Sequence, residues 1–335
     1  MRWWCKAPSF WWKSSLPWWG YLLIPLSKLW TWGGRFRECW TPRVSMLDLP
    51  PIISVGNSVI GGSGKTPSVQ ALAQYLQTHG WAPVIVCKGY QGQKKGTFRV
   101  DHRAYTPQEV GEEAWILSQS AMTWIVRDVE TFLRVHIPSF AYDKTVIILD
   151  DGHQSLRWPL AFRWLVIDHR QKFGNKRIIP AGPLREPLAH STHKADGILH
   201  ICYHASQVST VFKPGALHVP MQARYTWSPG FQPSRPTIGF AGIGFPKKFL
   251  LALQNQGIRP LRFITYPDHH HYTFKDWQYL QALARQYQAQ LITTEKDAVK
   301  LDPSWRVYVL KQRYHIAPSG QDQLQIWTEQ RFQSH

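Results

Sequence analysis

The sequence contains few cysteines and no long hydrophobic run, and each shortage excludes a class of protein. Its four cysteines stand far apart, without the paired spacing of a disulfide framework or a zinc site: Cys5, Cys39, Cys87 and Cys202. The apolar run from Leu16 to Leu26 is too short to cross a bilayer, which takes about 20 residues. No small-residue cleavage site follows this run, so a signal peptide fits poorly. We therefore expect a reduced, cytoplasmic protein.

Acidic residues are also scarce, since Asp and Glu number 21 against 39 Lys and Arg, for a net charge of +18. This excess favours an anionic partner, such as nucleic acid, an acidic lipid or a phosphorylated substrate. The sequence has no helix-turn-helix, zinc-finger or RNA-recognition motif, and its tryptophans do not interleave with basic residues along a groove. We therefore expect no nucleic-acid partner and keep nucleic-acid binding as the weakest alternative.

Aromatic residues gather at the N-terminal end, where nine of the 18 tryptophans lie within the first 40 residues. Two prolines interrupt the apolar run, and Lys28, Arg35 and Arg37 follow it. Trp and Tyr beside cations are typical of a membrane interface, because their amphipathic rings suit the headgroup level. Residues 1–45 are therefore predicted to form an interfacial segment with a helix. The alternative is a helix that packs on its own domain and exposes some aromatic rings.

The chain has 335 residues, of which 44% are hydrophobic, enough for one large or two medium globular domains. Beyond residue 48, short apolar runs alternate with helical patterns, and Ser68–Gln77 has the apolar spacing of a helix. This alternation predicts an α/β fold, a parallel sheet with helices on both faces. The predicted strands of this part are Ile52–Val55, Val84–Cys87, Thr123–Val126, Val146–Leu149, Trp164–Ile167 and Gly197–Ile201.

A second set of elements follows a stretch rich in Pro, Gly and Ser, Ser228–Pro236. Its spacing predicts a smaller C-terminal α/β domain over residues 229–335, after a main domain over 46–228. The predicted strands are Thr237–Ala241, Leu261–Thr265, Gln290–Thr293 and Val307–Leu310, and the predicted helices are Pro246–Asn255 and Phe274–Tyr287.

A glycine-rich turn lies between the first strand and the first helix, in the stretch I-I-S-V-G-N-S-V-I-G-G-S-G-K-T-P from Ile52 to Pro67. In a P-loop, backbone N–H groups close on phosphate oxygens, the lysine reaches the β- and γ-phosphates, and the Ser or Thr hydroxyl ligates Mg²⁺. The stretch departs from the general motif because Val59 replaces a glycine, and the alternative is a turn without a ligand. The predicted nucleotide-binding residues are Val59, Ile60, Gly61, Gly62, Ser63, Gly64, Lys65 and Thr66. The expected architecture is therefore P-loop NTPase-like.

Two carboxylates follow another buried strand, because Val146–Leu149 ends in Asp150 and Asp151. An aspartate at such a strand end holds the Mg²⁺ of many P-loop enzymes. The predicted metal ligands are Thr66, Asp150 and Asp151, with the choice between the two aspartates left open. The alternative is a solvated turn. The motif alone does not separate an ATPase, a GTPase and a kinase.

Six strings in this order make the chain similar to one family, the tetraacyldisaccharide 4′-kinases of lipid A biosynthesis. The resemblance extends from about Leu22, where P-L-S-K-L-W resembles a membrane-associated helix of the family, to about Lys300. The strings are V-G-N-S-V-I-G-G-S-G-K-T-P, D-D-G-H-Q at Asp150–Gln154, P-A-G-P-L-R-E-P at Pro180–Pro187, F-A-G-I-G-F-P at Phe240–Pro246, Y-P-D-H-H at Tyr266–His270 and T-T-E-K-D-A-V-K at Thr293–Lys300.

The resemblance implies an enzyme that transfers the γ-phosphate of ATP, with Mg²⁺, to the 4′-hydroxyl of an acylated glucosamine disaccharide 1-phosphate. Its product would be lipid IVA, a precursor of lipopolysaccharide. The family works at the cytoplasmic face of the inner membrane, so the resemblance implies a peripheral membrane protein. A lipid substrate and anionic headgroups would also suit the aromatic N-terminal segment and the basic charge.

The resemblance also implies the catalytic residues, which are Glu112, Asp268 and His269. The family pairs an aspartate of the string V-G-D-E with the histidine of D-H to activate the hydroxyl, and here Glu112 replaces that aspartate. A glutamate is one methylene longer but still accepts a proton. Because Glu112 and His269 lie in different predicted domains, we expect domain closure to bring them together. His270 and His271 are left unassigned, with a surface run or a weak metal site as alternatives.

Other functions remain open at this point. A different P-loop nucleotidase or ATPase would hydrolyse nucleotide without lipid transfer. A family member weakened by its departures, Glu112 above all, would bind ATP and transfer phosphate poorly. Arg185 and Glu186 of the string L-R-E-P are either a structural ion pair or part of the catalytic site.

Overall fold

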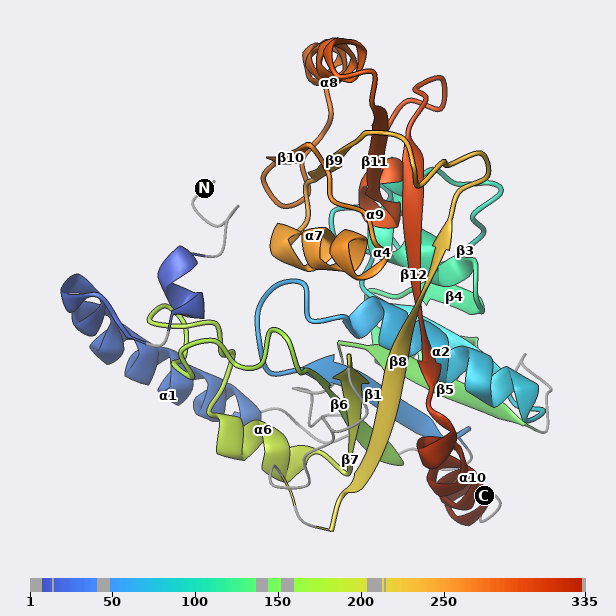
Figure 1. Ribbon diagram of the computed structural model, residues 1–335. Coiled ribbons are helices and arrows are strands. Elements are labelled where there is room, and N and C mark those ends of the chain that lie inside the picture. The colour runs from blue at the N-terminus through green and yellow to red at the C-terminus, as the bar shows by residue number, and fades with distance from the viewer. Residues whose placement is uncertain are drawn as a thin grey trace. The chain divides into compact units, whose positions relative to one another are not determined.

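The computed structural model describes residues 8–13, 15–40, 49–136, 144–151, 160–203, 213 and 215–332 (Figure 1). Gly152–Gln154, the end of the D-D-G-H-Q string, and Cys5 lie outside these residues. The chain divides into two compact units. The larger unit combines Pro8–Ala223 with Tyr314–His335, and the smaller unit comprises Arg224–Arg313. The predicted limits of the functional domains, 1–45, 46–228 and 229–335, stay a prediction.

A mostly parallel sheet forms the centre of the larger unit, in the order β8-β7-β6-β1-β5-β2-β4-β3. The edge strand β3 pairs antiparallel with β4. The strand bounds are β1 Ile52–Asn57, β2 Ala82–Cys87, β3 Phe98–Val100, β4 Met122–Ile125, β5 Thr145–Asp150, β6 Phe162–Asp168, β7 Gly197–Cys202 and β8 Leu217–Trp227. Strands β1 and β5 are neighbours in parallel register, with Val55 opposite Asp150, so their carboxyl ends meet at one edge.

Helices cover both faces of this sheet, because successive strand residues point to opposite sides. On one face, Ile53 and Ile148 pack with Leu72 and Leu76 of α2 and with Trp327 of α10. On the other face, Ile52 and Ile147 pack with Phe132 and Leu133 of α5. The helices of the larger unit are η1 Ser9–Trp12, η2 Trp18–Leu23, α1 Ile24–Trp40, α2 Lys65–Thr78, α3 Pro107–Val110, α4 Glu112–Ser118, α5 Val129–Val135, α6 Leu188–Lys194 and α10 Pro318–Phe332.

In the smaller unit, four strands pair in parallel in the order β10-β9-β11-β12. The same alternation builds its two cores: Ala241 and Ile292 pack with Leu253 of α7, whereas Phe240 and Leu291 pack with neighbours that include α8. Its elements are β9 Thr237–Ala241, α7 Pro246–Asn255, β10 Arg262–Thr265, α8 Phe274–Gln286, β11 Gln290–Thr294, α9 Glu295–Ala298 and β12 Tyr308–Ile316. By their residue numbers, β8 and β12 each belong partly to one unit and partly to the other.

The predicted fold class is confirmed, since the sheet is mostly parallel and helices lie on both of its faces. Every predicted strand has a counterpart, and the helix Pro246–Asn255 has its predicted bounds. The prediction missed the edge strand β3, the long strand β8 and several helices of four to seven residues, such as α3, α4, α5 and α6. These helices are too short for a 3.6-residue period to stand out.

The N-terminal helices of the larger unit leave many apolar side chains in solvent. None of the helices in the described part of the chain has the length and apolar character needed to cross a membrane. The exposed large side chains of η2 and α1 are Trp18, Trp19, Tyr21, Leu22, Leu26, Leu29, Trp30, Trp32, Phe36 and Trp40.

Candidate active site

The glycine-rich loop after β1 is held at both ends by one buried side chain. Asn57 is the last residue of β1, and its Nδ2 donates to the carbonyl of Val59 at 2.6 Å and to Oγ of Ser63. Gly61 and Gly64 have positive φ angles of 83° and 78°, which favour glycine. A Cβ on Gly64 would lie 2.4 Å from Cδ1 of Ile201, whereas a Cβ on Gly61 would meet open space. The loop is thus tightly packed at Gly64 and has open space beside Gly61.

Helix α2 begins directly after this loop, with Lys65 as its first residue. Ser68 secures the first turn, because its N–H and its hydroxyl both donate to the carbonyl of Gly64, at 3.1 and 2.8 Å. Thr66 is buried, with 7% of its surface exposed. The N-terminus of a helix carries partial positive charge and N–H groups without intrahelical partners, which favour a bound phosphate.

The two aspartates at the end of β5 lie beside the lysine of the loop. Nζ of Lys65 is 2.9 Å from Oδ1 of Asp151 and 3.9 Å from Oδ1 of Asp150. The structure therefore brings Lys65, Asp150 and Asp151 together, as the parallel pairing of β1 and β5 requires. Asp151 has a left-handed backbone, with φ 65°, which turns the chain at this point.

Arg185 also binds Asp151, at 2.8 Å from Nη1 to Oδ1 and 3.0 Å to Oδ2. Burial alone would raise the pKa of the Asp151 carboxyl, but the charges of Lys65 and Arg185 outweigh burial and hold that pKa well below its usual range. Asp151 is therefore ionised throughout the physiological range of pH.

The segment that carries Arg185 also holds the backbone of the loop. The N–H of Arg185 donates to the carbonyl of Ser58, and the N–H of Ile60 donates to the carbonyl of Pro183, both at 2.9 Å. Glu186 has other partners, since its Oε2 lies 3.1 Å from Nζ of Lys194 and 3.0 Å from Nδ1 of His190. Arg185 thus belongs to the cluster around Asp151, a role that the strings alone left open.

These residues have the chemistry that a magnesium nucleotide needs. Mg²⁺ prefers oxygen ligands, keeps several waters, and usually takes one or two carboxylates together with substrate phosphates. Asp150, Asp151 and the hydroxyl of Thr66 could supply such oxygens, and Lys65, which lies beside both aspartates, could supply a cation for the phosphates. Within the described ranges, no three His, Cys, Asp or Glu side chains are grouped to hold a metal by themselves. The donor set therefore fits a metal shared with phosphates. We call Asn57–Thr66, Asp150, Asp151 and Arg185 the nucleotide part.

Glu112 is the first residue of α4, in the larger unit. Gly111 before it has φ 89°, and a Cβ there would lie 2.5 Å from the carbonyl oxygen of Tyr90. Helix α4 is tied to the helix of the glycine-rich loop, because Nε2 of Gln70 in α2 donates to the carbonyl of Ile116 at 3.2 Å. The sharp turn at Gly111 thus sets where Glu112 begins its helix.

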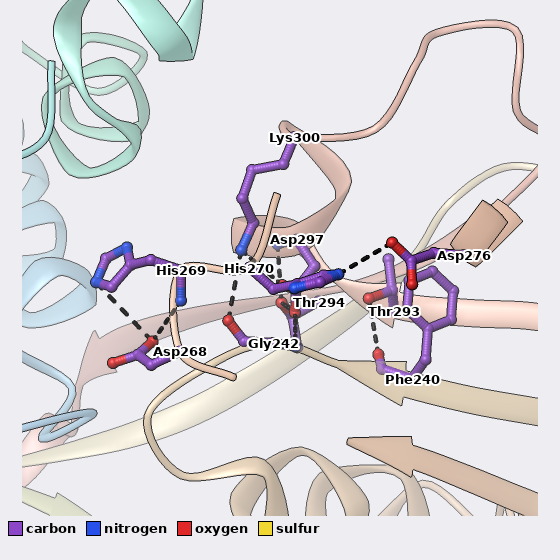
Figure 2. A network of polar contacts seen from close by, with 10 residues as sticks. All are labelled: Phe240, Gly242, Asp268, His269, His270, Asp276, Thr293, Thr294, Asp297 and Lys300. Carbon is purple, nitrogen blue, oxygen red and sulfur yellow. Dashed lines mark hydrogen bonds and ion pairs between the residues drawn. The ribbon is translucent and has the colours of Figure 1, made fainter. Parts of the chain in front are cut away.

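Asp268 and His269 lie in the smaller unit, in the turn between β10 and α8 (Figure 2). His269 has φ 56°, and its N–H lies 3.1 Å from both the carbonyl oxygen of Gly242 and Oδ1 of Asp268. Nε2 of His269 is 3.9 Å from the same Asp268 oxygen. The next histidine has other partners, since Nε2 of His270 is 3.1 Å from Oδ2 of Asp276 and its ring stacks on Tyr266.

The three predicted catalytic residues are thus divided, with Glu112 in one unit and Asp268 and His269 in the other. Their catalytic roles stay a prediction. The string Thr293–Lys300 contributed to the family resemblance, but no role was predicted for its residues. It places Asp297 and Lys300 beside Gly242 in the same network (Figure 2). We call Gly242, Asp268–Tyr272, Asp297 and Lys300 the histidine part.

The fold and the nucleotide part together define a class, the P-loop proteins that bind nucleoside phosphates on a parallel α/β sheet. The sequence model of one family, "LpxK: Tetraacyldisaccharide-1-P 4'-kinase", matches residues 19–330. The chain belongs to this family.

Curated relatives and a solved structure agree with that assignment. The chain is 37% identical over 261 residues to a tetraacyldisaccharide 4'-kinase of Gluconobacter oxydans, covering 77% of this chain and 78% of the relative. A second relative of that name, from Dinoroseobacter shibae, is 36% identical over 327 residues and 93% of each chain. The fold matches a crystal structure of LpxK from Aquifex aeolicus in complex with ATP, with a TM-score of 0.71 and 24% identity, over 93% of this chain and 99% of that one.

Proposed function

We propose that this protein transfers the γ-phosphoryl group of ATP to the 4′-hydroxyl of tetraacyldisaccharide 1-phosphate and so forms lipid IVA. The observation that carries the proposal is the cluster of Lys65, Asp150, Asp151 and Arg185 around a glycine-rich loop. The relatives named tetraacyldisaccharide 4'-kinase support the acceptor.

The nucleotide part would bind the phosphates of ATP. N–H groups of Val59–Thr66 would donate to phosphate oxygens, and Lys65 would exchange its contact with Asp151 for the β- and γ-phosphates. Thr66 and Asp150 or Asp151 would hold Mg²⁺, which neutralises charge on the transferred group when bound. Because Arg185 also binds Asp151, that carboxylate keeps a cationic partner when Lys65 leaves. The loop can therefore change partners without leaving a carboxylate unpaired.

Glu112, assisted by His269, would accept the proton of the 4′-hydroxyl, and Asp268 lies 3.9 Å from the imidazole, where it would help to orient the ring. Since these residues belong to different units, a reaction that uses both requires each unit to contact the same lipid. Oxygen attack on the γ-phosphorus, loss of the hydroxyl proton to the base, and departure of ADP then balance the reaction.

The exposed apolar side chains of η2 and α1 would hold the protein at the cytoplasmic face of the inner membrane. Trp and Tyr are favoured at the headgroup level, and a net charge of +18 favours anionic lipids. This arrangement would give the enzyme access to an acylated substrate that does not leave the bilayer.

Phosphate transfer from labelled ATP tests this function. Purified protein is incubated with Mg²⁺ and tetraacyldisaccharide 1-phosphate in detergent micelles, and the lipids are separated by chromatography. A bisphosphorylated lipid is the expected product. ATP hydrolysis that is independent of lipid would instead favour a P-loop nucleotidase. Bound ATP with neither transfer nor hydrolysis would indicate a family member that has lost its base.

A further inference from the structure

A fully buried carboxylate lies at the centre of the histidine part. Asp297, in α9, is 0% exposed, and its Oδ2 accepts from the N–H of Gly242 at 3.0 Å and from the hydroxyl of Thr294 at 2.8 Å. Its Oδ1 lies 2.8 Å from Nζ of Lys300, whose side chain is 4% exposed. Both charges of this pair are therefore out of contact with bulk water.

The pair reaches His269 through the backbone of one glycine (Figure 2). The N–H of Gly242 is bound to Asp297, and its carbonyl oxygen accepts from the N–H of His269 at 3.1 Å and lies 3.4 Å from Nζ of Lys300. Each ion of the pair thus contacts one polar group of Gly242. The carbonyl that holds the His269 backbone has its position set from the other side by Lys300.

No larger residue fits at Gly242 without a shift. A Cβ there would lie 3.1 Å from Oδ1 of Asp297, from the carbonyl of Pro267 and from the hydroxyl of Tyr272. Burial, and then the charge of Asp297, raise the pKa of Tyr272 far above its usual value, so its hydroxyl stays protonated. Nζ of Lys300 also lies over the Tyr272 ring, 5.6 Å from its centroid. Asp297, Pro267 and Tyr272 therefore closely surround Gly242.

A buried ion pair of this kind is a weak source of stability, because the desolvation of two charges offsets much of their attraction. The Asp297–Lys300 pair is better explained by its effect on the position of the Gly242 backbone. His269 has a left-handed backbone, a conformation that is strained for a non-glycine residue and persists only where the surroundings hold it. The hydrogen bond to Gly242 is part of what holds it.

We propose that Asp297 and Lys300 are positioning residues for His269: through the peptide groups of Gly242 they fix the backbone, and hence the imidazole, of the residue that assists Glu112 in accepting the substrate proton. This inference rests on the proposed function for its catalytic meaning. The positioning itself can be measured without catalysis, so the two can fail separately.

The first test is a double-mutant cycle in the kinase assay. Asp297→Asn keeps the shape of the side chain and removes its charge. In wild-type protein it should lower kcat about tenfold to a hundredfold, because misplacement of a reacting group by about 1 Å has that effect, while KM for ATP stays within about twofold. In a His269→Ala background, the same change should lower kcat less than about threefold. An equal loss in both backgrounds would overturn the proposal.

The second test measures the environment of the His269 ring by NMR. Carbon–proton NMR correlation spectra of the histidine rings, with His269 assigned by its absence in His269→Ala, are recorded in the absence of nucleotide. Asp297→Asn and Lys300→Met should each move the His269 signal. The matched control is Asp276→Asn, which removes a carboxylate of the same unit that contacts His270. It should move His270 and leave His269 in place.

The outcomes separate the two ideas. An unmoved His269 signal in a folded Asp297→Asn or Lys300→Met variant would overturn the positioning role, whatever the kinase assay gives. A moved signal with a His269→Ala variant of full activity would support positioning and reject the proposed catalytic role of His269. Lys300→Met is the alternative if Asp297→Asn does not fold, because its side chain can retain the apolar contacts of the lysine stem.

Discussion

The nucleotide part and the histidine part are built from different kinds of contact. In the nucleotide part, charged side chains meet directly, with Lys65 and Arg185 at 2.9 and 2.8 Å from Asp151. In the histidine part, a buried ion pair acts on backbone groups, and the turn of His269 is held through Gly242. In the nucleotide part, a cation can leave Asp151 for a ligand, whereas in the histidine part the ion pair fixes the backbone of the turn. This difference suggests one part that exchanges partners during turnover and one that stays fixed.

Removal of the exchanging cation should have the largest effect. Lys65→Ala should lower phosphate transfer by about 10³-fold or more, because phosphoryl transfer depends on position and charge and not on covalent help from the protein. The assay is transfer from labelled ATP to the lipid. Lys144→Ala, which removes an exposed lysine near the ring of Trp81, is the matched control and should keep full activity. Undiminished turnover of Lys65→Ala would remove the basis for a P-loop.

The second-largest loss of activity is expected when the proposed base in the larger unit, Glu112, is replaced. Glu112→Gln keeps the length of the side chain but not its basicity, so kcat should fall about 10²-fold or more with KM for ATP nearly unchanged. Glu112→Asp, which restores the residue of the family string, is the informative companion and should retain far more activity than the amide. If Glu112→Gln instead weakens ATP binding strongly, Glu112 contributes to the nucleotide part and is not a base.

A ladder of histidines in the larger unit should make that unit sensitive to acid. Nε2 of His169 lies 2.8 Å from Nδ1 of His200, and Nε2 of His200 lies 2.8 Å from Nδ1 of His218. Burial, followed by the two neighbouring rings, lowers the pKa of His200 from 6.5 to about 3. Between these values the unfolded chain binds the proton that the folded protein does not, so stability should fall as pH falls from 6.5 towards 3.

Urea unfolding at several pH values measures this loss, which should amount to a few kcal/mol in the larger unit. Hydrogen exchange followed by mass spectrometry assigns the loss to a unit. Peptides from β6, β7 and β8 should lose protection before peptides from β9 and β11. His200→Asn should flatten the pH dependence, although it will lower stability at neutral pH. A pH dependence that persists unchanged in a folded His200→Asn protein would exclude the ladder as its source.

The same contrast between side-chain and backbone contacts explains what could be predicted from the sequence. The glycine-rich loop and Lys65 could be predicted from one contiguous string of a strand, a turn and a helix, and Asp150 and Asp151 from another, the end of a buried strand. The contact of Arg185 with Asp151 joins residues 34 positions apart. Asp151 also has a left-handed backbone, which cannot be predicted from the presence of an aspartate. The role of Asp297 was missed for a related reason. It binds a backbone N–H, and every residue except proline has one, so residue types do not reveal the contact.

The smallest expected effect concerns a link from the N-terminal helix to the nucleotide part. The indole N–H of Trp30, in α1, donates to the carbonyl of Arg185 at 3.0 Å, and Arg185 in turn binds both Asp151 and the loop backbone. Trp30→Phe removes the N–H and keeps an apolar ring. A hydrogen bond at an exposed site contributes at most about 1 kcal/mol, so KM for ATP should rise only about two- to threefold.

A neighbouring tryptophan provides the control for that small change. Trp32 is 70% exposed, its ring lies 6.1 Å from that of Phe36, and Trp32→Phe removes the same indole group from the same helix. Both variants should bind anionic vesicles equally, because each keeps an aromatic ring at the surface. Only Trp30→Phe should change KM for ATP. If the two variants behave alike in both assays, the helix serves the membrane alone, and the nucleotide part depends on side chains within the sheet-bearing core and not on α1.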